Sequence, residues 1–571
     1  MLQLLNGARL RIGAGGSVLH NHDDPTVYTY AEGTSSKIRI SAGTELSLES
    51  GGSFKATNFV GRLIVEGAEG NPARIKVDSG NFSFHTASSV NPRMILGPYS
   101  ELLVTNTGLF HIDSTKDGSK YPPFYQAGGM IDVSGDSTFT VGRTKARPFG
   151  TGTTTFRGNA LLTVDEGLFD QKYYPDIYIG PSCNCETSTV VFTDHAKFYT
   201  AKFSSLTRFR VGDDSPLAEE NAITNGLAVL RYDSDSYSRF GSYFTVGSDY
   251  CRGELYLNSG SMSVTYGSLE VGGGNYEYRR DRSDAHGEGL MAVNGGTFDV
   301  RALNGHVDSI IQGLIVGAGW ESKLDGNSFY RGRLELNSGI VRSNTDAANV
   351  IVGAGRAKGE IVQNGGTFEH KRAERNFAMA IGFSGGDGSY VITGGTATVK
   401  SDLYVGGVLP STFNYTLDYC PNNHDAVGLL SVRGGTFSVV SNLVLSADGA
   451  GTLEIGGAGL LTVGGDLVLS NCTETASVAT LKYTFGASGV GSLSVGGDIV
   501  VASGSKLVVD MSEYTGPLKT FQLLDLSSAE GTFSDIEFVK PSVEGGNRLT
   551  LDVDADGIRV RTNHKTLIMI Y

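Results

Sequence analysis

Aromatic side chains in three polar stretches of the chain are the residues best suited to binding another molecule. Aromatic rings flanked by polar groups make favourable contacts with sugars and with protein surfaces. We predict that these rings form a binding surface; the alternative is that they fold back and cover the apolar body of the protein. The six candidate binding residues are Tyr276, Tyr278, Trp320, Tyr330, Tyr415 and Tyr419.

Two short segments contain residue types that bind metal ions. His20 and His22 would point to one side of an extended segment, but no third or fourth ligand can be placed beside them. Cys183 and Cys185 are close together, and the remaining cysteines lie far away in the sequence. We therefore expect ordinary polar turns at both places, and we predict no metal site and no cofactor.

The segment Asp552–Gly557 begins like a calcium-binding loop, with aspartates at every second position. Such a loop requires a bidentate glutamate at its twelfth position, and Asn563 stands there instead. Because the sequence on both sides alternates between apolar and polar residues, we predict a β-hairpin with Asp-Gly at its turn.

Two charged clusters are the best candidates in the sequence for acid–base catalysis. Asp213 and Asp214 follow Arg210, and a second cluster runs from Arg279 to His286. Solvated loop charges explain both clusters, and no serine–histidine–aspartate motif, phosphate-binding loop or dinucleotide fingerprint stands out. We predict no catalytic residue.

The elements that must carry these residues follow from an internal repeat. Apolar residues recur at every second position in short segments such as Leu430–Val432 and Phe437–Val439, with a glycine-containing turn between them. A third segment, Leu443–Leu445, completes the unit, and the next unit begins at Leu453, 23 residues after Leu430. Period-two alternation predicts strands, and glycine-rich turns bend the chain between them.

Units this short favour a coil in which each strand stacks about 4.8 Å above its predecessor in a parallel sheet. Propeller blades and β-sandwiches need longer units. The predicted fold is all-β: a single-stranded, right-handed parallel β-helix, or β-solenoid, with about three short strands per turn. We predict that the solenoid covers residues 1–503, and that residues 504–571 form C-terminal capping turns and a hairpin.

Unequal spacing between the units predicts loops. The extra length mostly follows the third strand of a unit, in the stretches 272–289, 317–332, 353–359, 382–389 and 406–428. Equivalent positions of successive turns stack in a solenoid, so these loops are expected along one edge. We expect function at that edge because loops carry a large share of binding residues.

Composition and charge exclude several classes of partner. The chain has 571 residues, 79 of them glycine, and its formal net charge of −14 disfavours nucleic acid and anionic membrane surfaces. The five scattered cysteines provide no disulfide framework, so packing must stabilise the fold. No apolar run approaches the roughly 18 residues of a membrane span, which predicts no direct membrane insertion.

The repeat resembles the β-helical passenger regions of bacterial autotransporters and related surface repeat proteins. Residues 430–439 show its form, L-x-V-x-G-G-T-F-x-V, which is followed by L-x-V-G in several units. The resemblance covers most of residues 1–500 as a style of repeat. It implies an exported chain, often an adhesin or a stalk, at an extracellular or cell-surface location, with its leader and anchor outside this sequence.

We therefore predict a non-catalytic secreted or cell-surface scaffold or adhesin that displays its loops to surface glycans or to proteins of host or neighbouring cells. The alternative is a polysaccharide-active β-helix, because pectin lyases, polygalacturonases and phage tailspikes share this architecture. That alternative predicts several carboxylates or bases converging in one groove. The motifs of polygalacturonases occur here in scrambled order, with Arg74–Lys76 first and Asn344–Asp346 late.

Overall fold

The computed structural model describes most of the chain, which divides into two compact units. The first unit comprises Met1–Gly273 and Ala285–Asn304, and the second comprises Gly274–Asp284 and Gly305–Tyr571. The described residues are 2–4, 7–21, 37–59, 62–86, 94–114, 124–142, 145–164, 176–180, 186–199, 208–212, 226–241, 243–247, 251–265, 267–273, 286–301, 313–319, 329–344, 349–371, 379–408, 425–472, 475–543 and 546–562.

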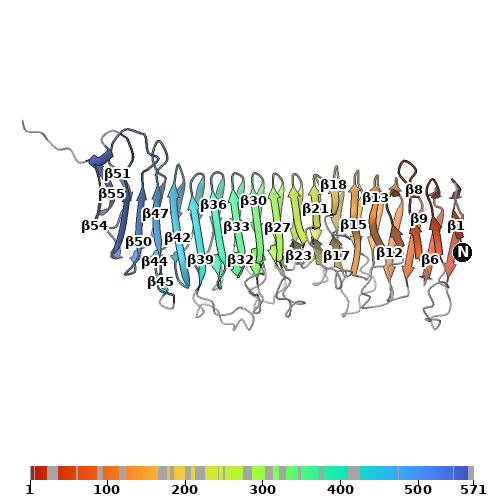
Figure 1. Ribbon diagram of the computed structural model, residues 1–571, viewed down its shortest axis with the longest axis horizontal. Helices are drawn as coiled ribbons and strands as arrows, with labels where there is room; N and C mark the ends of the chain where they lie inside the picture. The colour runs from red at the N-terminus through yellow and green to blue at the C-terminus, as the bar shows by residue number, and fades with distance from the viewer. Residues whose placement is uncertain are drawn as a thin grey trace, which may run out of the picture. The chain divides into compact units, whose positions relative to one another are not determined.

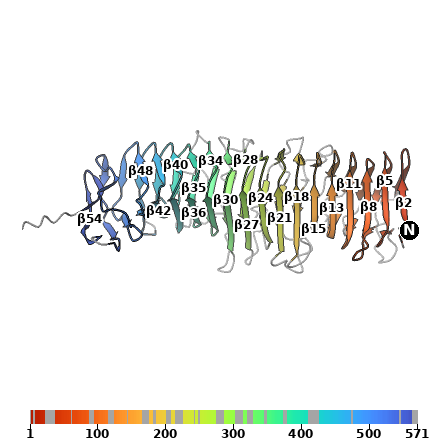
Figure 2. The same ribbon diagram turned by 90° about the horizontal axis from the view of Figure 1, so that it is seen from above.

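Each unit is a coil of short strands in which strands at equivalent positions of successive turns pair in parallel. We name the three ladders that result A, B and C, in the order in which the chain visits them from β2 onward; β1 belongs to ladder C. Figure 2 shows β2, β5, β8 and β11 of ladder A side by side in chain order. The prediction of an all-β parallel β-helix is confirmed. Within the described ranges, no helix has the length and apolar composition that crossing a bilayer requires.

The first unit contributes the following strands. Ladder A has β2 (Arg9–Ile12), β5 (Glu45–Glu49), β8 (Ala73–Asp78), β11 (Ser100–Thr105), β13 (Phe124–Val133), β15 (Lys145–Phe156), β18 (Thr187–Phe192), β21 (Gly226–Tyr232), β24 (Cys251–Leu257) and β27 (His286–Val293). Ladder B has β3 (Ser17–Asn21), β6 (Ser53–Phe59), β9 (Asn81–Thr86), β12 (Leu109–Ser114), β14 (Thr138–Val141), β16 (Leu161–Val164), β19 (Lys197–Tyr199), β22 (Tyr237–Phe240), β25 (Ser261–Val264) and β28 (Thr297–Val300). Ladder C has β1 (Leu2–Leu4), β4 (Lys37–Ile40), β7 (Arg62–Val65), β10 (Met94–Leu96), β17 (Asp176–Ile179), β20 (Arg208–Val211), β23 (Tyr243–Val246) and β26 (Ser268–Gly273). The long strands β13 and β15 begin in ladder C and continue into ladder A.

The second unit repeats the arrangement (Figure 1). Ladder A has β30 (Phe329–Leu336), β33 (Lys358–Gln363), β36 (Asp387–Ile392), β39 (Ala426–Val432), β42 (Gly449–Gly456), β47 (Thr480–Thr484), β50 (Lys506–Asp510) and β53 (Asp535–Val539). Ladder B has β31 (Ile340–Ser343), β34 (Thr367–His370), β37 (Thr396–Val399), β40 (Thr436–Val439), β43 (Leu460–Val463) and β48 (Ser492–Val495). Ladder C has β29 (Gly313–Gly319), β32 (Asn349–Gly355), β35 (Met379–Phe383), β38 (Leu403–Val405), β41 (Leu443–Leu445), β44 (Leu467–Leu469), β49 (Ile499–Val501) and β52 (Ala529–Gly531).

Side chains along each strand point alternately inward and outward, and the inward-pointing ones form the core of each unit. In the first unit, Phe54, Phe82 and Phe110 of successive turns are each at most 1% exposed. The ring centroids of Phe54 and Phe82 are 4.9 Å apart, as are those of Phe82 and Phe110. Identical side chains at one position can stack in this way because parallel strands of successive turns are about 4.8 Å apart.

The turn from ladder A to ladder B requires glycine. Gly395 has a φ of 82° and Gly435 a φ of 67°, in the left-handed region that side chains disfavour. A Cβ on Gly395 would lie 2.4 Å from the main-chain oxygen of Gly366 in the preceding turn, and one on Gly435 would lie 2.5 Å from that of Gly395. Two independent constraints, conformation and stacking, therefore explain why glycine recurs here.

The C-terminal region continues two of the ladders before it changes to antiparallel pairing. β50 and β53, in the region for which the sequence predicts capping turns, still pair in parallel, from Lys506 with Asp535 to Asp510 with Val539. An antiparallel sheet follows, in the order β51 (Phe521–Leu524), β55 (Gly557–Thr562) and β54 (Leu549–Asp554), beside a short 3₁₀ helix, Gly546–Arg548. The hairpin predicted at Asp552–Gly557 is confirmed as the β54–β55 turn.

Replacing Gly395 with alanine should destabilise the second unit by about 2–3 kcal/mol, because the new Cβ meets both a left-handed φ and the backbone below. Urea unfolding followed by circular dichroism measures the change. Thr398→Ala, at a half-exposed position of β37, the strand that follows Gly395, is the matched control and should shift the free energy of unfolding by no more than about 0.5 kcal/mol. Equal effects of the two substitutions would contradict the stacking constraint.

Candidate functional site: the corners beside ladder C

The lengths of the connections between ladder strands show where each turn accepts extra residues. We name the corners AB, BC and CA after the ladders that they join. Before residue 510, every interval longer than seven residues between described ladder strands lies at BC or CA. The intervals are 22–36, 115–123, 165–175, 200–207, 301–312 and 371–378 at BC, and 212–225, 274–285, 320–328, 406–425 and 470–479 at CA.

This distribution corrects the prediction of one loop-bearing edge. The intervals 274–285, 320–328 and 406–425 follow the third strand, as the sequence predicts. The predicted loops 353–359 and 382–389 instead lie largely in strands β32, β33, β35 and β36, whose connections are only 356–357 and 384–386. Further insertions follow the second strand, so they flank ladder C on both sides.

An insertion that the structure describes shows how such a segment can be accommodated. Between β44 and β47, at corner CA, β45 (Asn471–Cys472) and β46 (Ser477–Val478) form an antiparallel pair. Cys472 is 4% exposed and a free thiol. The insertion therefore forms a small hairpin of its own, while the ladders on either side keep their parallel pairing.

Across β29, β32 and β35 of the second unit, the outer face of ladder C is apolar and is not presented to solvent. Ile315, Ile351 and Ala380 alternate with inward-facing residues, so they point away from the interior, yet each is at most 1% exposed. Phe383 and Val408, each 3% exposed, join the same cluster. The two insertion corners of this unit therefore border an apolar outer face.

One of the six predicted binding residues lies in the described part of the chain. Tyr330 is the second residue of β30 and is 1% exposed. Its ring therefore belongs to the core and cannot present a face to a ligand. This is the alternative that the sequence left open for the aromatic residues. Tyr276, Tyr278, Trp320, Tyr415 and Tyr419 lie outside the described residues.

The other charged and metal-binding candidates fall mostly outside the described residues as well. This holds for His22, Cys183, Cys185, Asp213, Asp214 and the cluster 279–285, and for the side chains of His20 and His286. Arg210 is described: it is 6% exposed, and its guanidinium carbon lies 5.2 Å from the centroid of the Tyr178 ring in the preceding turn. Its packing is that of a structural arginine.

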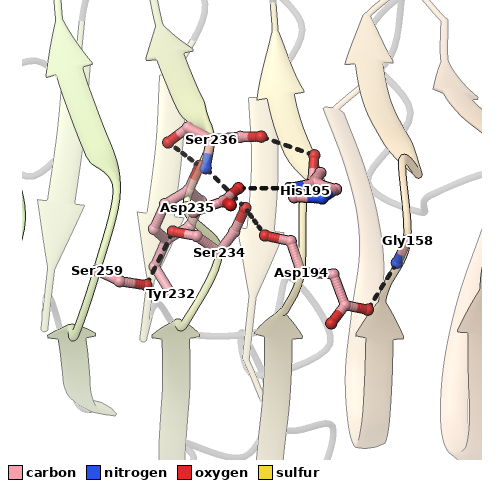
Figure 3. A network of polar contacts seen from close by, with 8 residues as sticks. All are labelled: Gly158, Asp194, His195, Tyr232, Ser234, Asp235, Ser236 and Ser259. Atoms are coloured by element: carbon pink, nitrogen blue, oxygen red, sulfur yellow. Dashed lines mark hydrogen bonds and ion pairs between the residues drawn. The ribbon is translucent and has the colours of Figure 1, made fainter.

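Corner AB of the first unit is bound together by polar contacts between successive turns (Figure 3). Asp194 Oδ2 accepts a hydrogen bond from the Gly158 amide at 2.9 Å, and the Asp194 carbonyl accepts one from Ser234 Oγ at 3.1 Å. Ser259 Oγ in turn donates to the Ser234 carbonyl at 3.0 Å. These contacts link four consecutive turns, so this corner is a structural seam.

His195, Asp235 and Ser236 in this seam contain the residue types of a hydrolytic triad. His195 Nδ1 lies 2.6 Å from Asp235 Oδ1, and both side chains are about two-thirds exposed, at 63% and 64%. Ser236 Oγ, however, donates to the main-chain oxygen of His195 at 2.8 Å. A nucleophilic serine must instead be bonded to the imidazole, so the arrangement does not activate Ser236.

Ladder A in the second unit holds a deeply buried carboxylate, Glu454, within a cluster of charged residues. The Glu454 side chain is 4% exposed and accepts hydrogen bonds from Ser431 Oγ at 2.6 Å, Thr484 Oγ1 at 2.8 Å and the Arg433 guanidinium at 2.9 Å. Lys482 Nζ lies 3.5 Å from Glu454 Oε1. Burial alone would raise the pKa of Glu454, but these hydrogen bonds and the Arg433 charge outweigh it and lower the pKa from 4.5 to about 2. A general acid needs a raised pKa, so Glu454 suits a structural role.

Register also brings together three residues that the sequence did not single out. His85, His111 and Asp113 place their ligand atoms within 4.8 Å of one another on the outer face of ladder B. They come from two turns, and only the alignment of β9 with β12 pairs Asp113 with His85. Histidine and aspartate at matching positions of consecutive units would have been the sequence signal.

The hydrogen bond and charge of Asp235 raise the pKa of His195 above its ordinary 6.5. A raised folded-state pKa means that the pair stabilises the fold fully below the unfolded value and stops doing so as the pH rises through the folded value. NMR titration should show the raised midpoint, and Asp235→Asn should return it toward 6.5. Asp233→Asn, on the same turn but bonded to Asn258, should leave the midpoint nearly unchanged. An unshifted His195 in the wild type would contradict the contact.

Glu454→Gln should lower the free energy of unfolding at pH 7 by about 2 kcal/mol, because two cations lose their buried counter-charge. Since the pKa is lowered, the difference from wild type should shrink as the pH falls from 4.5 toward 2. Urea unfolding at several pH values measures this trend. Glu360→Gln breaks the more exposed pair with Arg333 and should change stability by less than about 1 kcal/mol. A difference that does not vary with pH would be inconsistent with the assigned charge.

Comparison with known proteins does not assign the chain to a family. No family model matches the chain, and no curated protein or solved structure matches it either. The fold class therefore rests on the parallel register of the ladders themselves.

Proposed function

We propose that the protein is a non-catalytic scaffold or adhesin that is secreted or held at a cell surface and displays the insertions at corners BC and CA. The observation that carries this proposal is the confinement of the long intervals to the two corners beside ladder C. Equivalent corners of successive turns stack within a unit, so inserted segments leave the coil in a row at about 4.8 Å per turn.

The ladders suit display because they are held by main-chain pairing and core packing that the insertions do not interrupt. β38 and β41 pair from Leu403 with Leu443 to Val405 with Leu445, although 406–425 follow β38 and only Ser446–Asp448 follow β41. A rigid base and repeated weak contacts can sum to strong attachment through multivalency. Surface glycans and proteins of neighbouring or host cells are the partners that this arrangement suits.

The resemblance to autotransporter passengers supports an exported, surface-held role, and the net charge of −14 argues against nucleic acid as the partner. The polysaccharide-cleaving alternative lacks a supporting observation among the described residues. His195 is not aimed at a serine, and Glu454 has its pKa shifted in the direction opposite to that of a general acid.

A deletion can separate display from folding. Removing residues 409–424 keeps the buried Val408 and leaves Gly406, Gly407, Val408 and Asp425 between β38 and β39, a connection one residue longer than Ser446–Asp448 between β41 and β42. We expect circular dichroism and the thermal unfolding midpoint to stay close to those of the wild type, and binding to a glycan array or to intact cells to fall severalfold.

Trp320, the single tryptophan of the chain, provides an independent readout because it lies in the 320–328 interval. Its fluorescence should change when glycans that score on the array are added. Arg333→Ala, on ladder A, is the control that should keep full binding. Unchanged binding after the deletion, with silent Trp320 fluorescence, would refute display by these insertions. Release of reducing or unsaturated sugars from a polysaccharide would favour the enzymatic alternative.

A further inference from the structure

We propose that His85, His111 and Asp113 form a binding site for a late first-row divalent transition metal, with Zn²⁺ as the representative ion. The three residues lie on the outer face of ladder B in the first unit. Phe82 and Phe84 of β9, and Phe110 and Ile112 of β12, are fully buried. Because side chains alternate along a strand, His85, His111 and Asp113 all point outward.

The parallel register of β9 and β12 creates the cluster. Asp113 pairs with His85, and His111 pairs with Ser83, two residues earlier on the same strand. His111 and Asp113 are likewise two residues apart, so the three side chains occupy adjacent positions on one face. A residue on one turn and two on the next would then bind the same ion and connect the turns.

The distances suit a first-row ion. His85 Nδ1 lies 3.2 Å from Asp113 Oδ2, and the ligand atoms of all three residues lie within 4.8 Å of one another. A tetrahedral zinc ion with bonds of about 2.0–2.1 Å holds its ligand atoms about 3.4 Å apart. The His85 and Asp113 atoms already meet this spacing, and the ligand atom of His111 lies within 4.8 Å of both.

The burial of the carboxylate supports the same conclusion. The Asp113 side chain is 3% exposed, whereas that of His85 is 23% exposed. In the next turn Gly142 donates its amide to the Ile112 carbonyl at 2.7 Å, and a Cβ on Gly142 would lie 2.4 Å from Asp113 Oδ1. The absence of a side chain at Gly142 therefore leaves the space in which the carboxylate lies.

Two imidazoles and a carboxylate are a ligand set that Zn²⁺, Co²⁺, Ni²⁺ and Cu²⁺ favour, whereas Ca²⁺ and Mg²⁺ prefer oxygen ligands alone. Three protein ligands leave a position for water on the more exposed His85 side. Because the ion would bind the folded register and not the unfolded chain, occupancy should raise the thermal stability of the first unit.

Calorimetric titration of tag-free, chelator-treated protein with ZnCl₂ tests the site, together with thermal unfolding with and without Zn²⁺. We expect one tight equivalent and a higher unfolding midpoint in the wild type. His85→Gln, at a partly exposed ligand, should fold normally and weaken that equivalent by roughly tenfold or more, as should Asp113→Asn. Substituting Co²⁺ should give the visible bands of a tetrahedral ion only when all three residues are present.

His195→Gln is the matched control, because it removes a histidine that also lies beside an aspartate but has no third ligand in the described part of the chain. It should leave the tight equivalent unchanged. If His85→Gln and Asp113→Asn bind Zn²⁺ as tightly as the wild type, or if the wild type shows no tight equivalent, the proposal is wrong and the His85–Asp113 contact is only an ion pair.

Discussion

Parallel stacking at about 4.8 Å per turn is the constraint on which the rest of the structure depends. Each turn must present side chains and corners that fit directly on those of the turn before it. In the first unit this requirement produces the row Phe54, Phe82 and Phe110, with ring centroids 4.9 Å apart. At corner AB of the second unit it requires glycine at 395 and 435, where a Cβ would meet the main chain below.

The same constraint leaves the outer faces free to differ. In the second unit, ladder A carries charges such as Glu454 and Lys482, and ladder B carries hydroxyl residues such as Thr398. The outer face of ladder C is apolar and buried across β29, β32 and β35. Corner AB is closed by stacked glycines and by asparagine pairs such as Asn337 with Asn364, so added residues are accommodated at the other two corners without disturbing the pairing.

Stacking also places residues from different turns beside one another and so creates chemistry that no linear motif contains. Ser431 and Glu454 meet across one register step, as do His195 and Asp235 across one corner and His85 and Asp113 on ladder B. The consequences differ with burial. The buried Glu454 has a lowered pKa and is kept ionised. The exposed His195 has a raised pKa, so its pair with Asp235 responds to pH. The buried Asp113 lies beside two imidazoles and forms a ligand set with them.

The sequence by itself determined the coil, its strands and the C-terminal hairpin, because period-two alternation and glycine turns are local features that specify strand and turn directly. It did not determine which corners carry the insertions or that Tyr330 is buried. Those outcomes depend on the register between turns. The pairing of His85 with Asp113 shows this most clearly, since the spacing between such residues varies from turn to turn and only the stacked backbone decides which side chains become neighbours.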